Sequence, residues 1–129
     1  MMPWFSIDGT TYNMPCSIDR VAEIRPSDIS GMLLDKKYFN DVLGTYMKYT
    51  ISIAIPTGEE QTYANLYDVL TSPVASHTVN VPYTQGRITI VGRIETVSDR
   101  YYREEDGIHI WRSTKFEITA NEPSRVNSL

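Results

Sequence analysis

Residues 57–72 read TGEEQTYANLYDVLTS and interrupt a chain that is otherwise patterned as β-strands. Pro56 ends the preceding strand, and Thr57 and Glu60 have the spacing of a capping box. Apolar residues then recur at i, i+3, i+4 and i+7, which is the spacing of an amphipathic helix whose apolar face packs against the core. This helix core stripe consists of Tyr63, Leu66, Tyr67 and Leu70. The sequence therefore predicts one helix, Thr57 to Ser72, packed on a sheet.

Alternating apolar and polar residues predict strands before this helix. Asp8-Gly9 is a favoured two-residue hairpin turn and separates Trp4 to Ile7 from Thr10 to Met14. Ser17 to Arg25 fits a further strand, although its alternation is imperfect. Thr45 to Ile55 alternates clearly, with one apolar face and one polar face. We expect a hairpin followed by two longer strands.

Three further strands are predicted after the helix. His77 to Tyr83 alternates, and Pro82 places this strand at a sheet edge because proline cannot donate a ladder hydrogen bond. A long strand around Ile88 to Ile94 is interrupted at Gly92, where a bulge or a close backbone approach is expected. Ile108 to Ala120 is the matching strand of a long hairpin.

These elements predict a mainly β fold with one α-helix, arranged as an antiparallel β-sandwich or barrel. The length of 129 residues suits a single domain, which we assign to residues 1–120. Gly31 to Leu34 is patterned as a short strand, and Asp35 to Gly44 as a loop or a helical turn. Residues 121–129 are polar, contain Pro123 and are predicted to form a loose C-terminal tail.

Composition limits the classes of function. The net charge is -4 and the 12 Lys and Arg residues are scattered, so specific nucleic-acid binding is not expected. Cys16 is the only cysteine, which rules out an internal disulfide. The sequence contains neither an apolar run of membrane-spanning length nor a secretory pattern in its first residues, so we expect no membrane insertion and synthesis in the cytoplasm.

The chemistry-bearing residues do not form a recognised catalytic pattern. His77 and His109 are the only histidines, and neither has a metal-ligand spacing. The carboxylates of residues 104–106 are adjacent and lack the spaced ligands of a calcium loop. Cys16 has no nucleophile signature, and the glycines form no nucleotide-binding motif. The sequence predicts a protein that is not an enzyme and has no metal or cofactor site.

The segment Ser98 to Gly107 is polar and strongly charged and lies at the tip of the predicted long hairpin. Two adjacent tyrosines there have little core to enter, and aromatic residues and arginines are enriched at protein interfaces. We therefore expect a protruding arm that docks on another subunit; the alternative is a flexible loop. The candidate interface residues are Arg100, Tyr101, Tyr102, Arg103, Glu104 and Glu105.

Three segments together resemble small structural proteins of tailed bacteriophages and prophages. They are Trp4 to Gly9, residues 63–70 with Pro73-Val74 and His77 to Tyr83, and the closing strand with Trp111, Phe116 and Ile118 that runs into Glu122 to Arg125. The resemblance implies a β-sandwich or barrel with a flanking helix, as in tail-tube, distal-tail and connector proteins. It also implies assembly into homo-oligomeric rings, contacts with other tail or baseplate proteins, location in the virion, and no substrate or cofactor.

Three hypotheses of function follow, in this order. The first is a virion structural subunit that self-assembles into a ring. The second is a monomeric β-sandwich module that binds a peptide, glycan or small ligand, and the third is a small enzyme. A deep pocket with convergent polar groups would favour the second or third, whereas flat apolar and tyrosine-rich surfaces on opposite sides would favour the first. Long strands with exposed edges also invite pairing, and a head-to-tail interface closes into a ring when its rotation permits.

Overall fold

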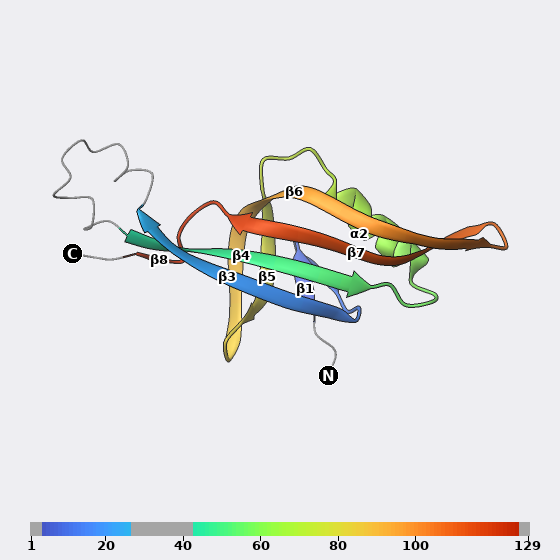
Figure 1. The fold of residues 1–129 in the computed structure, drawn as a ribbon, viewed down its shortest axis with the longest axis horizontal. Coiled ribbons are helices and arrows are strands. Elements are labelled where there is room, and N and C mark those ends of the chain that lie inside the picture. The colour runs from blue at the N-terminus through green and yellow to red at the C-terminus, as the bar shows by residue number, and fades with distance from the viewer. Residues whose placement is uncertain (1–3, 27–42, 127–129) are drawn as a thin grey trace.

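A computed structural model describes residues 4–26 and 43–126 of the chain. Among them lie one helix and eight strands, and these strands all pair in antiparallel fashion (Figure 1). The elements are β1 (Phe5–Ile7), β2 (Thr10–Tyr12), β3 (Cys16–Pro26), β4 (Leu43–Ala54), α2 (Glu60–Leu70), β5 (His77–Tyr83), β6 (Gly86–Glu105), β7 (Ile108–Ala120) and β8 (Arg125–Val126). The predicted mainly β fold with one helix on the sheet is confirmed.

Except for β6, which runs from Gly86 to Glu105 and so extends well past the predicted Ile88 to Ile94, the predicted strands agree with the structure to within a few residues. The β1–β2 hairpin turns at Asp8 and Gly9, whose φ angles of 50° and 92° are the positive values that such a turn requires. The strands expected around residues 17–25, 45–55 and 108–120 are β3, β4 and β7. The predictions for residues 31–34 and for most of 35–44 lie outside the described residues; 43 and 44 belong to β4.

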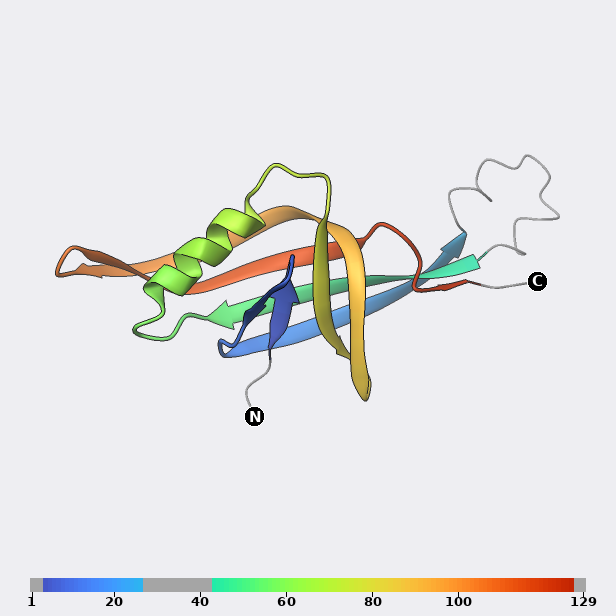
Figure 2. The same cartoon turned by 180° about the vertical axis from the view of Figure 1, so that it is seen from behind.

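The strands follow the order β2-β1-β5-β6-β7-β4-β3, with β8 added beside β4. Figure 2 shows that the sheet folds over, so that β5 and the first part of β6 cross the long strands β7, β4 and β3. The arrangement is sandwich-like, with the two halves belonging to one continuous sheet. Among the described strands, β2 and β3 end the order and do not pair with each other, so the sheet is not closed into a barrel.

The turn between the two halves lies at Gly92. This residue pairs with His77 of β5 on one side and with Ala120 of β7 on the other, so β6 changes partners here. A Cβ atom at position 92 would clash with the backbone carbonyl of Thr119. The predicted close backbone approach at Gly92 is therefore confirmed, while the nearest register shift in the β6–β7 ladder falls between Ile94 and Val97.

The core lies between the folded halves of the sheet. Phe5 of β1 contacts Phe116 of β7 with ring centroids 5.9 Å apart, and the Tyr49 hydroxyl of β4 donates to the Pro82 carbonyl of β5 at 2.9 Å. The largest fully buried side chains come from both halves of the sheet, from the segment between β2 and β3, and from α2: Phe5, Ile7, Met14, Tyr49, Ile51, Ile53, Leu66, Val79, Val81, Phe116 and Ile118. Burying these apolar surfaces stabilises the fold because it removes them from water.

The helix α2 is shorter than predicted and starts differently. It spans Glu60–Leu70 rather than Thr57 to Ser72, and its N-cap, Glu59, makes no side-chain capping hydrogen bond. The predicted Thr57 capping box is therefore wrong. Gly58 has a φ of 95°, a value favoured by glycine, and its N–H donates to the Glu60 carboxylate. The chain thus enters the helix through a glycine turn.

The helix packs through three of the four residues in the predicted stripe. Tyr63, Leu66 and Leu70 are buried against the sheet, which confirms their placement. Tyr67 remains 38% exposed and lies at the edge of the contact. The prediction that Tyr67 belongs to the buried stripe is therefore wrong. The sheet covers a narrower strip of the helix surface than the four residues of the stripe occupy.

Two smaller expectations are also corrected. The strand β5 lies between β1 and β6 and is not an edge; β1 pairs only with Val79 and Asn80, which leaves Pro82 beyond its reach. The tail is tied down over residues 121–126, because the Ser124 N–H donates to the Thr45 carbonyl and β8 pairs with β4. Residues 127–129 lie outside the described part of the chain.

Replacing Leu66 with alanine should destabilise the protein by about 2–5 kcal/mol, because its side chain is fully buried between helix and sheet. The free energy of unfolding from urea titration measures this effect. Asn65→Ala, on the exposed face of the same helix, is the matched control and should change that energy by less than about 0.5 kcal/mol. Equal effects of the two substitutions would contradict the packing described for α2.

Replacing Gly92 with alanine should cost about 1–3 kcal/mol, since the added methyl group meets the backbone carbonyl of Thr119. The matched control is Gly86→Ala at the start of the same strand, where an added Cβ has no neighbour within 4 Å. The same urea titration compares them. A Gly92→Ala protein as stable as the Gly86→Ala protein would overturn the assignment of this corner.

Candidate functional site

The β6–β7 hairpin extends past the helix as a long arm (Figures 1 and 2). Its strands continue to Glu105 and restart at Ile108, so the predicted polar tip segment is strand almost throughout. The turn itself is Asp106-Gly107, with φ angles of 52° and 80°. A two-residue turn with positive φ at both positions keeps the strands paired to the end. The alternative of a flexible loop over Ser98 to Gly107 is therefore wrong.

Tyr101 lies on the face of the arm that is turned toward the helix. Its ring centroid is 5.1 Å from that of Trp111 and 5.8 Å from that of His109. Its hydroxyl oxygen is 2.9 Å from Nδ1 of His109. Tyr101 nevertheless stays 45% exposed. It is a surface aromatic residue whose orientation is fixed by its neighbours on the arm.

Tyr102 follows Tyr101 and contacts a different set of residues. The Arg112 guanidinium lies 4.4 Å from its ring centroid and that of Arg103 lies 5.1 Å away. Arg103 also forms an ion pair with Glu105 at 2.7 Å. Arg100 and Glu104 are exposed and take part in none of the ion pairs found in residues 4–26 and 43–126. The six candidate interface residues thus lie together on the arm, and Tyr102 is 49% exposed.

The folded sheet leaves two long strand edges without a partner strand in the described chain. β3 pairs only with β4, and β6 beyond Gly92 pairs only with β7. The strands β6, β7, β4 and β3 therefore form a four-stranded layer with an open edge on each side. Val21 and Ile24 on β3 are 54% and 74% exposed. Sequence reasoning anticipated exposed edges in general, but the pairing order was needed to identify them.

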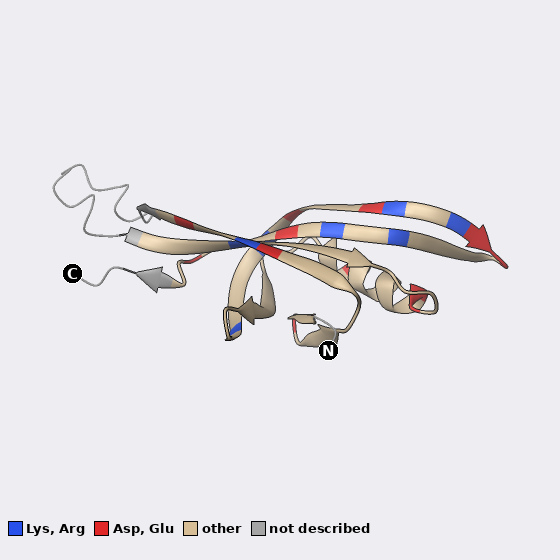
Figure 3. Cartoon of the chain, turned by 60° about the horizontal axis from the view of Figure 1, so that its bottom comes forward, with Lys and Arg blue, Asp and Glu red and all other residues tan. Residues whose placement is uncertain are grey.

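Charges of both signs are spread along this layer (Figure 3). Lys48 pairs with Glu23 of the neighbouring strand at 3.9 Å, and Arg93 pairs with Glu95 at 2.7 Å. These pairs are exposed and contribute little to stability. They do give the outer face of the layer a mixed, hydrated surface rather than a single-sign field.

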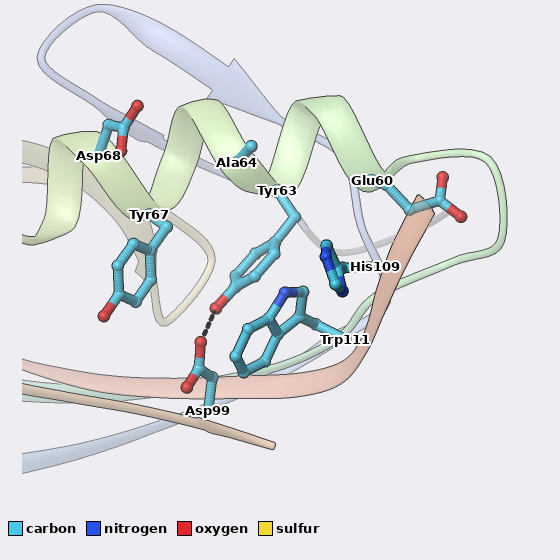
Figure 4. Close-up of a pocket in the computed structure, with 8 residues that line it drawn as sticks. All are labelled: Glu60, Tyr63, Ala64, Tyr67, Asp68, Asp99, His109 and Trp111. Atoms are coloured by element: carbon cyan, nitrogen blue, oxygen red, sulfur yellow. Dashed lines mark hydrogen bonds between the residues drawn. The ribbon is translucent and has the colours of Figure 1, made fainter. Parts of the chain in front are cut away.

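A half-open pocket of about 340 Å³ lies between α2 and the arm (Figure 4). Its walls are aromatic, with the rings of Tyr63 and Tyr67 from the helix and of Trp111 from β7. The lining also includes Glu60, Ala64, Asp68, Asp99 and His109. The sequence analysis did not identify this pocket. The residues of β6 and β7 that share the helix-facing side, 99, 101, 109 and 111, could have indicated it.

The Tyr63 hydroxyl donates a hydrogen bond to Oδ2 of Asp99 at 2.5 Å. Burial of the phenol, together with this hydrogen bond to a carboxylate, raises the pKa of Tyr63 well above its usual value. Tyr63 therefore stays neutral and keeps donating, which holds Asp99 in place at the back of the pocket. The contact ties the helix to the arm across 36 residues of sequence.

A second polar contact lies at the start of β5. Nδ1 of the buried His77 is 2.8 Å from Oδ2 of Asp8, and the Thr78 N–H donates to the same carboxylate. Burial acts to raise the pKa of Asp8, but the hydrogen bonds from Thr78 and His77 outweigh it and lower the pKa below its usual value. The pair fastens the β1–β2 turn to β5 and has a structural role.

Residues 4–26 and 43–126 contain no group of three or more His, Cys, Asp or Glu side chains placed to hold a metal ion. No helix within those ranges is long and apolar enough to cross a membrane. The pocket and the arm are the features that offer recognition chemistry.

Comparison with known proteins gives no family. A scan against protein-family models and a search of curated proteins return no match to this chain.

Proposed function

We propose that this protein is a non-enzymatic structural subunit of a tailed phage or prophage virion, which assembles into a tail-tube, distal-tail or connector ring. The observation that carries the proposal is the four-stranded layer whose two long edges, β3 and the second part of β6, are open. A long open edge is a template for pairing with another chain, and monomeric proteins usually block such edges.

The strand directions in this layer fit a repeating assembly. Because every pairing is antiparallel, β6 and β4 run one way while β7 and β3 run the other. A second copy in the same orientation would therefore bring its β6 beside β3 of the first in antiparallel register. An even number of strands keeps the alternation unbroken from copy to copy. Such a head-to-tail interface closes into a ring when the rotation per copy allows it.

The arm supplies a second contact in this proposal. Tyr101 and Tyr102 lie beyond the core and expose about half of their surface. Surface tyrosines and arginines are the residue types that contribute most to protein interfaces. In the proposed ring the arm reaches a neighbouring copy or another tail or baseplate protein, and the subunit is made in the bacterial cytoplasm before it joins the virion.

A second candidate function is a monomeric module that binds a peptide, glycan or small ligand. One observation favours it, namely the aromatic pocket between α2 and the arm. Pockets of a few hundred Å³ with apolar walls and a few polar groups are typical of ligand sites. This function and ring assembly predict different behaviour of the purified protein.

The purified protein should form rings or tubes as its concentration rises, measured by light scattering after size exclusion and by electron microscopy. Ile24→Lys on the open edge of β3 should raise the concentration needed for assembly about tenfold, since a lysine there disfavours strand pairing. Ile24 is 74% exposed, so the monomer should fold normally.

The matched control for this edge variant is Val74→Lys, which also puts a charge at an exposed apolar site, 55% exposed, but lies in the loop after α2. It should assemble like the unaltered protein. A monomer at every concentration would reject the ring proposal and support the binding module. Equal assembly of both variants would reject β3 as the contact.

Replacing both Tyr101 and Tyr102 with alanine should weaken assembly while changing the free energy of unfolding of the monomer by less than about 1 kcal/mol, because both rings are about half exposed and lie on the arm, outside the core. Sedimentation velocity and thermal denaturation measure the two effects. Val74→Ala, which removes exposed apolar surface elsewhere, is the control. A large loss of monomer stability with unchanged assembly would place the tyrosines in the fold and not in an interface.

A further inference from the structure

We propose that the pocket between α2 and the β6–β7 arm is a binding site for an organic cation, a guanidinium or alkylammonium group. The proposal does not depend on ring assembly. It rests on the aromatic walls of the pocket, on the carboxylates around it, and on the arginine contacts that cover most of the other partly exposed aromatic rings.

The aromatic walls form a corner. The rings of Tyr63 and Tyr67 lie 6.0 Å apart at an interplanar angle of 60°, and those of Tyr63 and Trp111 lie 6.4 Å apart at 49°. Figure 4 shows both tyrosines descending from the helix toward the strand that carries Trp111. A cation placed in such a corner faces more than one π-system, and indole is the strongest of the cation–π partners.

The charges of the lining residues also favour a cation. Glu60, Asp68 and Asp99 line the pocket, and none of its lining residues is a lysine or arginine. None of these three carboxylates takes part in an ion pair within the described ranges. Asp99 uses Oδ2 to accept from Tyr63, and no described hydrogen bond uses its other oxygen. The pocket therefore has carboxylate oxygens that can accept hydrogen bonds from a bound cation.

Elsewhere in the described chain, three of the four other partly exposed aromatic rings are covered by the protein's own arginines; the exception is Tyr101, which packs on Trp111 and His109. The guanidinium of Arg87 lies 3.3 Å from the ring centroid of Trp4 and that of Arg20 lies 5.3 Å from Tyr83. Tyr102 is covered by Arg112 in the same way. No such contact is found for Tyr63, Tyr67 or Trp111 in the described residues. A cation that covers these pocket rings must come from outside the described chain.

The dimensions of the pocket agree with an occupant of this kind. Its volume of about 340 Å³ is at the lower end of the range for ligand sites and can accept the end of an arginine side chain or a small amine. The guanidinium plane can stack on an indole while its N–H groups reach a carboxylate, which an ammonium does less well. The same chemistry would recognise an arginine on a partner protein or a free small cation.

The test is a titration of ¹⁵N-labelled protein followed through its two tryptophan indole N–H signals. The probe is the peptide acetyl-Gly-Arg-Gly-amide, and its counterpart with neutral citrulline in place of arginine is the matched ligand control. We expect a saturable shift of the Trp111 signal with the arginine peptide only. The Trp4 signal, already beneath Arg87, is an internal reference and should move little.

Two pocket variants and one control keep the test specific. Tyr67→Leu removes a half-exposed wall, and Asp99→Asn removes a charge but keeps an oxygen that accepts from Tyr63. Each should weaken binding at least about fivefold, which corresponds to roughly 1 kcal/mol. Tyr102→Leu removes an aromatic ring of the arm outside the pocket and should leave the affinity unchanged.

The free amine agmatine, which carries a guanidinium on a short chain, distinguishes the two sources of the cation. Tighter binding of the peptide assigns the site to an arginine of a partner protein, and equal or tighter binding of agmatine assigns it to a free small cation. Both results support the cation site. The proposal is overturned if Trp111 does not respond to either probe, if the citrulline peptide binds equally well, or if Tyr67→Leu and Asp99→Asn bind as strongly as the Tyr102→Leu control.

Discussion

The backbone of β6 at Gly92 passes so close to Thr119 of β7 that no side chain fits between them, and the architecture depends on this approach. Up to Gly92, β6 pairs with β5; from Gly92 onward it pairs with β7. One strand therefore belongs to both halves of the folded sheet. A Cβ at this corner would press on the β7 backbone at the point where the two halves of the sheet join, and the halves meet in the core through contacts such as that of Phe5 with Phe116.

The same change of partner creates the surface on which the proposed function rests. Because β5 leaves at the corner, the rest of β6 has a partner on one side only, and β3 is likewise paired only with β4. The four-stranded layer between these edges continues into the arm. Exposed edges of this length are unfavourable in an isolated soluble protein because they promote aggregation, but they suit a subunit whose edges pair with further copies.

The helix links the core to the arm through aromatic and carboxylate side chains. Leu66 and Leu70 anchor α2 in the core, while Tyr63 reaches the arm and donates to Asp99. Tyr67, the member of the predicted stripe that is not buried, forms a wall of the pocket instead. A residue that local pattern assigns to the core is thus found at the candidate binding site. Both proposals involve the arm, but the open edge of β3 belongs to ring assembly alone and Tyr67 to the pocket alone, so the two can be tested separately.

The local sequence pattern was sufficient to predict most of the strands, turns and the helix, but it was not sufficient to predict how they pair and pack. The alternation in β4 and β7, the Asp8-Gly9 turn and the helical stripe were readable because each depends on residues close in sequence. The interior position of β5 and the pairing of the tail were not, since each depends on contacts between distant segments. The start of α2 was also missed, because two local signals compete there and the glycine turn at Gly58 forms in place of a Thr57 cap. The sequence alone determined a mainly β chain with one amphipathic helix. Only the tertiary structure decided which edges stay open and which aromatic rings meet, because strand order and the contacts across the folded sheet are long-range and leave no local periodicity.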